Sequence, residues 1–289
     1  MDANMIFTVD MLPEIRKQMK EMMKDMPIFG EEITVPTRAG QTRCLVYKPE
    51  HRQGPSPVFF NVHGGGFVMG DPEGDDFMCK KFRDALDITV INVEYRLAPE
   101  TKWPGDKEDV YDVVKYVVDH ADEFGIDPNC MAIGGHSAGA NISTVVCMMG
   151  RETGDFSFKC QILDYPPLDL LKDPFAKFYT EGAIPPEVAD MFNKAYCSDP
   201  AETGQVYCSP VYAEVDFLKG MPPAVILTCE IDSLRDEGEE YGKKLAQAGV
   251  EVTMKRFLGV AHGFTSDPMN PLADAGHQMM IEGLRKYLL

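Results

Sequence analysis

Apolar and polar residues alternate with two different spacings along the chain. Apolar residues recur three and four positions apart, as on one face of a helix, near 11–26, 75–86, 109–120, 142–149, 187–196, 237–248 and 279–287. Short apolar runs typical of strands lie at 32–35, 42–47, 58–62, 88–93, 131–133, 160–163, 224–229 and 250–257. Strands that alternate with helices predict an α/β protein with a mostly parallel central sheet flanked by helices, and the turn at 37–40 predicts an antiparallel hairpin at its start.

Two stretches do not belong to this alternation. Residues 1–30 predict an amphipathic helix whose methionine-rich face either covers part of the core or lines an apolar substrate entrance. Between about 171 and 212 the chain is irregular, and its short helices are broken by Pro174, Pro185, Pro186, Pro200 and Pro210. We therefore expect a helical segment at 1–30, followed by one α/β domain at 31–289 that carries an excursion at about 171–212.

The charge of the chain limits its partners. Its 289 residues include 28 lysines and arginines against 46 aspartates and glutamates, a formal net charge of -18, with no basic run to bind phosphate groups. Nucleic acid and anionic membranes are therefore not expected as partners. No apolar run approaches the length that spans a bilayer, and the first ten residues lack an export signal. These features predict a cytoplasmic protein without a membrane span.

The eight cysteines are scattered along the chain, several of them inside apolar strand or helix patterns, and none forms a Cys-x-x-Cys pair. Such a distribution is typical of reduced, mostly buried thiols rather than of disulfides or of a zinc site. No metal is expected.

The stretch at 131–141 combines a strand, a sharp turn and the start of a helix. The turn is Gly135-His136-Ser137-Ala138-Gly139, in which two glycines allow strand and helix to approach closely and permit strained dihedral angles at the serine. The helix that follows directs the positive end of its dipole at Ser137. Because a G-x-S-x-G pattern occurs by chance in roughly one chain in ten of this length, other segments must support a catalytic role.

A run of three glycines follows the strand at 58–62, in His63-Gly64-Gly65-Gly66-Phe67. Backbone N–H groups of such a loop, at the carboxyl end of a parallel strand, can point at one oxygen atom, as a tetrahedral acyl-transfer intermediate needs. A flexible glycine turn without a ligand is the alternative. His63 is expected to brace the loop.

A serine nucleophile needs a base within hydrogen-bond reach. Of the six histidines, His262 is the best candidate, because it follows the last strand in a short loop whose glycine gives the ring room to reach inward. His136 adjoins the serine, where neighbouring side chains point in different directions, and is the weaker candidate. The simplest interpretation of the others outside the glycine loop is as surface residues, namely His51, His120 and His277.

The base needs in turn a carboxylate that orients it. Asp232 comes just after the strand at 224–229, and the chain order Ser137, Asp232, His262 is the one found in α/β enzymes with a serine on such a turn. Two acidic residues nearby are alternatives. Glu230 could brace either partner, whereas Asp236 more simply caps a helix or pairs with a neighbouring arginine.

Six motifs occur in the order in which one known family has them. Between about 57 and 289 the chain resembles the hormone-sensitive-lipase family of α/β-hydrolase esterases, in His63-Gly64-Gly65-Gly66-Phe67, Tyr95-Arg96-Leu97-Ala98-Pro99-Glu100, Gly135-His136-Ser137-Ala138-Gly139, Ser209-Pro210, Asp232-Ser233-Leu234-Arg235-Asp236-Glu237 and His262-Gly263-Phe264. The resemblance implies an α/β-hydrolase fold in which Ser137 is the nucleophile, His262 the base and acid, and Asp232 its orienting partner. It also implies an oxyanion hole formed by backbone N–H groups of Gly65, Gly66 and Ala138, with Gly64 beside them.

The same resemblance implies a small helical cap over the site. The family builds it from N-terminal helices and an insertion late in the sheet, which correspond here to residues 1 to about 30 and roughly 171–212. The chain departs from the family at three positions, with His136 where Asp is common, Ala140 where Gly is common and Ser233 where Pro is common. None of these removes a triad member, but a histidine before the nucleophile also resembles some formamide-cleaving and carbohydrate-deacetylating relatives.

Together these features predict a serine carboxylesterase that hydrolyses short- to medium-chain acyl esters through an acyl-enzyme intermediate, without a cofactor. A small-molecule acyl ester is the expected partner, and homo-oligomerisation is left open. One alternative is a carbohydrate deacetylase, an aryl-formamidase or another amidase that uses the same triad. The alternative from another class is a small-molecule receptor on the same fold, which the retention of His262 disfavours.

Overall fold

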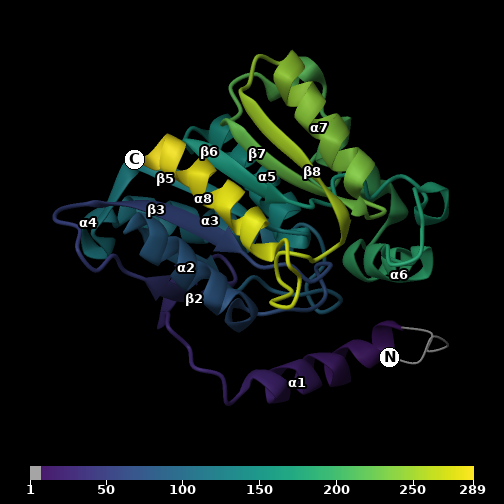
Figure 1. Ribbon diagram of the computed structural model, residues 1–289, viewed down its shortest axis with the longest axis horizontal. Helices are drawn as coiled ribbons and strands as arrows, with labels where there is room; N and C mark the ends of the chain where they lie inside the picture. The colour runs from purple at the N-terminus through teal and green to yellow at the C-terminus, as the bar shows by residue number, and fades with distance from the viewer. Residues whose placement is uncertain (1–7) are drawn as a thin grey trace.

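An eight-stranded sheet forms the centre of the protein, in the order β1-β2-β4-β3-β5-β6-β7-β8 (Figure 1). The computed structural model describes residues 8–289. β1 and β2 form an antiparallel hairpin, β2 is antiparallel to β4, and all the other pairs are parallel. The strands are β1 Glu31–Thr37, β2 Gly40–Tyr47, β3 Ser56–Val62, β4 Thr89–Val93, β5 Ile126–His136, β6 Cys160–Asp164, β7 Ala224–Ile231 and β8 Val252–Ala261.

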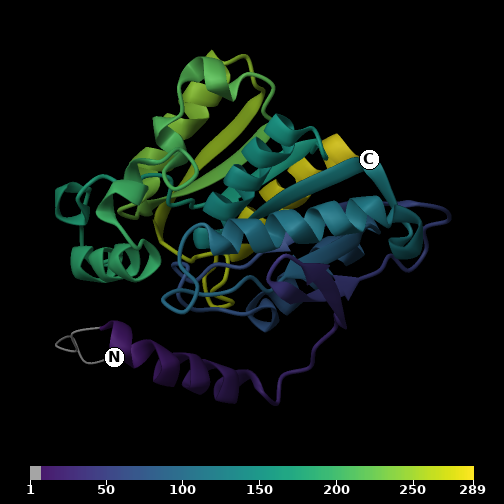
Figure 2. The same cartoon turned by 180° about the vertical axis from the view of Figure 1, so that it is seen from behind.

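Helices cover both faces of this sheet. α3 (Gly105–Asp119), α5 (Ala138–Thr153) and α7 (Arg235–Gln247) pack on one face, and α2 (Asp76–Leu86) and α8 (Ala273–Leu288) pack on the other. Figure 1 shows α2 and α8 in front of the sheet, and Figure 2 shows α3 and α5 from behind. Since both faces are covered, central strands such as β3 are buried along their whole length, which explains their unbroken apolar runs.

This architecture confirms the predicted α/β class and its antiparallel start. The last strand differs from the prediction, because β8 continues to Ala261 instead of ending at 257. The extra residues place His262 at the carboxyl edge of the sheet. That edge is where ligands bind in open parallel sheets.

The first helix lies apart from the sheet (Figures 1 and 2). α1 (Leu12–Met23) follows a 3-10 turn, Val9–Met11, and buries only Leu12 among its described side chains. Arg16 attaches it to the body, because its guanidinium donates to the carbonyl of Val68 at 2.6 Å, to the carbonyl of Ala98 and to the Glu100 carboxylate. The part of the N-terminal prediction that falls on residues 1–7 lies outside the described residues.

The long connection between β6 and β7 carries α6 (Pro186–Tyr196), which stands beyond the end of the sheet (Figure 1). The rest of the connection is irregular and holds four 3-10 turns, Pro174–Ala176, Pro200–Gly204, Pro210–Tyr212 and Val215–Leu218. Elsewhere a further 3-10 turn, Pro72–Asp75, precedes α2, and the short helix α4 (Ala121–Phe124) precedes β5.

Candidate active site

Ser137 occupies the sharp turn between β5 and α5. Its backbone has φ 52° and ψ −125°, a conformation that L-residues rarely adopt, and its N–H donates to the carbonyl of Asp164 at 2.9 Å. The glycine two residues later is required by packing, since a Cβ at Gly139 would lie 1.9 Å from the carbonyl oxygen of Val62. The close approach of α5 to β3 therefore holds the serine hydroxyl above the sheet edge.

Asp232 follows β7 and His262 follows β8, and both side chains reach Ser137. Nε2 of His262 accepts a hydrogen bond from the Ser137 hydroxyl, with 2.9 Å between the two atoms. Nδ1 of the same ring donates a hydrogen bond to Asp232 Oδ2 over 2.8 Å. Asp232 is fully buried, and its other carboxylate oxygen accepts the N–H of Leu234 at 3.0 Å. Three side chains that are far apart in the sequence thus form one hydrogen-bonded row, as their positions after β5, β7 and β8 predicted.

Tyr165, which the sequence did not single out, packs against the row. Its ring centroid lies 4.6 Å from that of His262, at 61° between the planes, and its hydroxyl is 2.8 Å from Thr265 Oγ1. The residue follows β6 directly, so its position after a strand was the available signal. The buried aromatic ring limits the freedom of the imidazole.

The glycine loop after β3 approaches the same point. Gly65 has φ 122° and Gly66 has φ 60°, and added Cβ atoms would lie 2.0 Å from the Met69 carbonyl oxygen and 2.7 Å from the Phe192 ring. Only glycine fits both positions. Within residues 8–289, the N–H groups of Gly65, Gly66 and Ala138 donate no intramolecular hydrogen bond. These are the three groups that the resemblance names as oxyanion donors.

Gly64 differs from its neighbours, because both its polar backbone groups are occupied. Its N–H donates to Nε2 of His136 at 3.2 Å, and its carbonyl accepts from Nδ1 of His63 at 2.8 Å. The His63 ring also stacks on Tyr95 with centroids 4.2 Å apart. Burial lowers the pKa of His63. Since a carbonyl can only accept, the contact to Gly64 places a proton on Nδ1 of the ring.

The two acidic alternatives lie away from the histidine. Glu230 accepts the N–H of Gly259 on β8 at 2.7 Å, and Asp236 pairs with the neighbouring Arg235 at 3.0 Å. Neither carboxylate makes a hydrogen bond to His262 within residues 8–289. Asp232 is therefore the carboxylate that the structure brings to the ring.

The interpretation of His277 as a surface residue was wrong. The side chain is buried between α8 and the loop after β8, where Nε2 donates to the carbonyl of Thr265 at 2.9 Å. Burial lowers its pKa. Its place on the core side of α8 depends on how that helix packs, which the sequence around it did not reveal.

A cavity of about 400 Å3 opens above the row and extends towards α6. Its surface is mainly apolar, with Met69, Leu170, Ile184, Val188, Phe192 and Leu234 among its lining residues. Lys177 and Asp169 are the charged residues at its margin. No described residue of α1 lines it; a second cavity of about 550 Å3 lies beside α1, away from Ser137.

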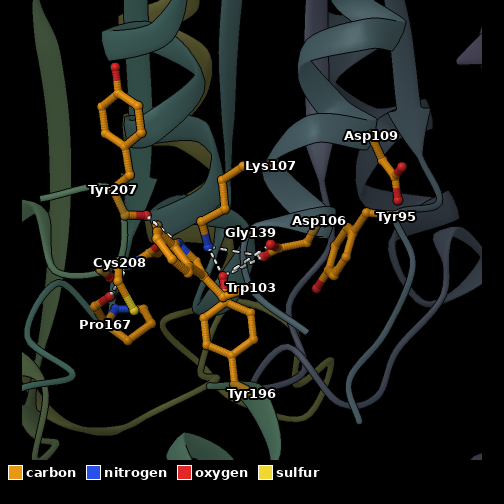
Figure 3. Close-up of polar contacts among 12 residues, drawn as sticks. Tyr95, Trp103, Asp106, Lys107, Asp109, Gly139, Pro167, Tyr196, Tyr207 and Cys208 are labelled. Carbon is orange, nitrogen blue, oxygen red and sulfur yellow. Dashed lines mark hydrogen bonds and ion pairs between the residues drawn. The ribbon is translucent and has the colours of Figure 1, made fainter. Parts of the chain in front are cut away.

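The C-terminal end of α6 is anchored by a buried polar cluster that the sequence did not predict (Figure 3). The Lys107 ammonium on α3 lies 2.9 Å from Asp106 and contacts the hydroxyl of Tyr196, which donates to the same carboxylate at 2.9 Å. Tyr196 in turn stacks on Phe67, the residue after the glycines, with centroids 4.0 Å apart. Lys107, Asp106 and Tyr196 therefore connect α6 to the glycine loop.

The structure was also searched for metal ligands and membrane helices. In residues 8–289 no three histidine, cysteine or acidic side chains gather as a metal site would require. None of the helices in that part of the chain has the length and apolarity needed to cross a bilayer.

A serine, a histidine and an aspartate in one row at the carboxyl edge of a mostly parallel sheet define the class of the protein as an α/β hydrolase. Comparison with known proteins agrees. The family model described as alpha/beta hydrolase fold matches residues 59–266. The carboxylic ester hydrolase LipN of Mycobacterium tuberculosis is 33% identical over 287 residues, covering 94% of this chain and 76% of that protein.

Two solved structures are similar over almost the whole chain. The hyperthermophilic esterase of the archaeon Pyrobaculum calidifontis has a TM-score of 0.86 and 34% identity, covering 98% of this chain and 94% of that one. EstE1, a thermostable carboxylesterase from a metagenomic library, has a TM-score of 0.85 and 34% identity, covering 96% and 98%. The chain belongs to the α/β-hydrolase family, in its hormone-sensitive-lipase branch of esterases.

Proposed function

We propose that the protein is a serine carboxylesterase in which Ser137 is the nucleophile, His262 the general base and acid, and Asp232 the residue that orients His262. The observation that carries this proposal is the row of hydrogen bonds of 2.9 Å and 2.8 Å that joins the three side chains. A serine hydroxyl is a weak nucleophile at neutral pH, and a base in contact with it removes that limit. The relatives described above are all esterases. None of them supports an amidase, sugar deacetylase or receptor function for this chain.

The reaction proceeds in two half-reactions. His262 takes the proton of Ser137 as the serine oxygen attacks the ester carbonyl, and then gives that proton to the departing alcohol as the acyl-enzyme forms. A water molecule next attacks the acyl-enzyme, with His262 again accepting the proton and returning it to the serine oxygen. Asp232 holds the ring in the tautomer with its proton on Nδ1 and stabilises the imidazolium during both steps.

The negative oxygen of each tetrahedral intermediate needs donors that are already in place. We assign this role to the backbone N–H groups of Gly65, Gly66 and Ala138. Ala138 is the first residue of α5, so its N–H carries part of the positive end of the helix dipole. Gly65 and Gly66 lie on the loop after β3, whereas Ala138 follows Ser137 directly.

We propose short- to medium-chain acyl esters as the substrates, because the cavity is small. A volume of about 400 Å3 is near the lower end of the roughly 300–1,000 Å3 range of ligand sites. We propose a catalytic domain at 31–289, with 171–212 as a cap insertion that closes the cavity through α6. The assignment of residues 1–30 to the cap stays a prediction. We place the enzyme in the cytoplasm, because its eight cysteines are unpaired thiols and seven of them are buried.

Hydrolysis of p-nitrophenyl acetate and butyrate tests the proposal. We expect Ser137→Ala to lose at least about 10⁴-fold in kcat while its circular dichroism spectrum and melting temperature stay those of the wild type. Ser143→Ala is the matched control, since that serine lies on α5 and only donates to a carbonyl of its own helix. Near-full activity of Ser137→Ala would contradict the proposal.

A further inference from the structure

The glycine loop carries the proposed oxyanion donors, yet three consecutive glycines have little conformational preference of their own. Something outside the loop must therefore hold their N–H groups in place before the substrate arrives. The carbonyl of Gly65 accepts the N–H groups of Val68 and Met69 at 3.1 Å and 3.0 Å, and a second attachment of the loop lies at Gly64. Its N–H and its carbonyl are both hydrogen-bonded to histidine rings, whereas Gly65 and Gly66 donate no hydrogen bond within the described residues.

The geometry of the peptide bond shows what these contacts fix. The carbonyl of Gly64 and the N–H of Gly65 belong to one trans peptide plane and point in opposite directions. His63 therefore sets the direction of the Gly65 N–H through the bond to the Gly64 carbonyl. The preceding peptide plane contains the carbonyl of His63 and the N–H of Gly64. The carbonyl accepts a hydrogen bond from the Tyr95 hydroxyl at 3.0 Å, and the N–H donates one to His136. Loss of the His136 contact would leave this second plane held by Tyr95 alone.

The His136 ring lies between Gly64 and the buried carboxylate of Asp75, although its Nδ1 makes no hydrogen bond within the described residues. A neutral imidazole that accepts at Nε2 carries its proton on Nδ1, and Asp75 Oδ2 lies 3.5 Å from that atom. The same carboxylate oxygen accepts from the Asn61 side chain at 2.7 Å, which keeps Asp75 in position. The ring also fills the space beside Gly64, where an added Cβ would lie 2.6 Å from it.

We propose that His136 is a positioning residue of the ester hydrolysis, whose Nε2 lone pair holds the glycine loop so that the Gly65 and Gly66 N–H groups face Ser137. The inference rests on the proposed function. His136 acts through Gly64 and takes no part in the proton transfers of Ser137 and His262. The residue between the strand and the nucleophile thus links the serine turn to the glycine loop.

Two substitutions separate the acceptor from the bulk of the ring. His136→Leu keeps an apolar side chain of similar reach but removes the acceptor, and we expect kcat to fall about 10- to 100-fold, less than or equal to the cost of losing one oxyanion donor. His136→Gln retains an acceptor for Gly64 and a donor for Asp75, and we expect it to recover kcat to within about five-fold of the wild type. KM should change by less than about three-fold in both variants.

A transition-state mimic gives a readout that a general loss of stability would not reproduce. The inhibition constant of a trifluoromethyl ketone, which forms an oxyanion on Ser137, should rise in His136→Leu by about the factor by which kcat/KM falls. Equal losses in the leucine and glutamine variants, or a leucine variant with the kcat and the inhibition constant of the wild type, would overturn the proposal. Active-site titration gives the concentration of folded enzyme, and the rates of both variants are divided by it.

The wild-type protein offers a further test, in which the His136→Gln variant serves only to assign the signals. In its ¹⁵N-histidine NMR spectrum, the signals absent from His136→Gln should belong to a ring with a proton on Nδ1 and an unprotonated, hydrogen-bonded Nε2. A proton on Nε2 would contradict the contact to Gly64. Activity that survives in Ser137→Ala would refute the proposed function. The results on His136 test only the role of this residue in holding the glycine loop.

Discussion

The two walls of the cavity are built differently. On the sheet side, Ser137, Asp232 and His262 each follow directly after a strand and are joined by hydrogen bonds of 2.8–2.9 Å. On the other side, α6 presents the half-buried apolar side chains of Val188 and Phe192. Strand ends in a packed sheet fix positions closely, whereas apolar contacts on a helix are non-directional. We infer that the first wall sets the chemistry and the second sets the size of the acyl group.

Buried polar groups hold both ends of the second wall, in addition to its apolar packing. The cluster of Lys107, Asp106 and Tyr196 holds the C-terminal end of α6, and Glu237 on α7 holds the start of the same connection. Glu237 accepts the N–H groups of Leu168 and Asp169 at 2.8 Å and 3.1 Å, and pairs with Lys177 at 2.6 Å. Changes at these sites should affect stability and substrate size rather than bond breaking.

The largest effect is expected in the first wall. Asp232→Asn should reduce kcat by about 10⁴-fold, because an amide at this position favours the wrong tautomer of His262. Asp236→Asn is the matched control, since that carboxylate contacts Arg235 on the surface and should change kcat less than about three-fold. Steady-state hydrolysis of p-nitrophenyl butyrate measures both. Equal losses in the two variants would contradict the assignment of Asp232.

The next effect concerns the anchor of α6. Lys107→Met leaves the buried carboxylate of Asp106 without its cation, so the free energy of unfolding should fall by about 3–5 kcal/mol. Lys194→Met on α6 removes an exposed ion pair with Asp190 and should cost less than about 1 kcal/mol. Urea unfolding followed by fluorescence compares them. Similar midpoints for both variants would show that the cluster anchors nothing.

The dependence of stability on pH tests the other attachment. Burial raises the pKa of Glu237 from 4.5 to about 7, so between these values the folded protein holds a proton that the unfolded chain has lost. The free energy of unfolding therefore falls as pH rises through this window, by on the order of 2 kcal/mol. Glu237→Gln removes this component. Its urea midpoint should decline less than that of the wild type between pH 5 and pH 8, while Glu240→Gln should follow the wild type.

The smallest effect concerns substrate size. Phe192→Ala removes a ring that lies against Gly66, so kcat/KM for p-nitrophenyl octanoate relative to acetate should rise about ten-fold, as expected for a pocket that gains a few methylene groups. Phe175→Ala, in the same connection but exposed, serves as control. An unchanged ratio in Phe192→Ala would mean that α6 does not limit the acyl group.

The same contrast between the two walls explains which parts of the fold and the site could be predicted from the sequence. Ser137 and His262 could be located because each lies next to a strand in a glycine-containing turn, and strand ends in a parallel sheet share one edge. Tyr165, Lys107 and the burial of His277 were missed. Their roles depend on contacts between segments distant in the sequence, and no spacing pattern records which side chains will meet.

The glycine loop illustrates both cases. Its three glycines indicated a close approach of backbone to a ligand, and the packing against Met69 and Phe192 gives a physical reason for two of them. That Gly64 donates to His136, and so differs from its neighbours, required the structure. A departure from the family pattern, at a residue first considered as a weak candidate base, thereby acquired a different explanation.

The most direct test of the account is the site at which a fluorophosphonate probe attaches to the wild-type protein. If Ser137 is activated by His262 beside a preformed set of backbone donors, peptide mass spectrometry will find a single phosphonyl adduct on the peptide that contains Ser137, and His262→Ala will form it far more slowly. An adduct on another residue, or equal labelling of the two proteins, would contradict the account.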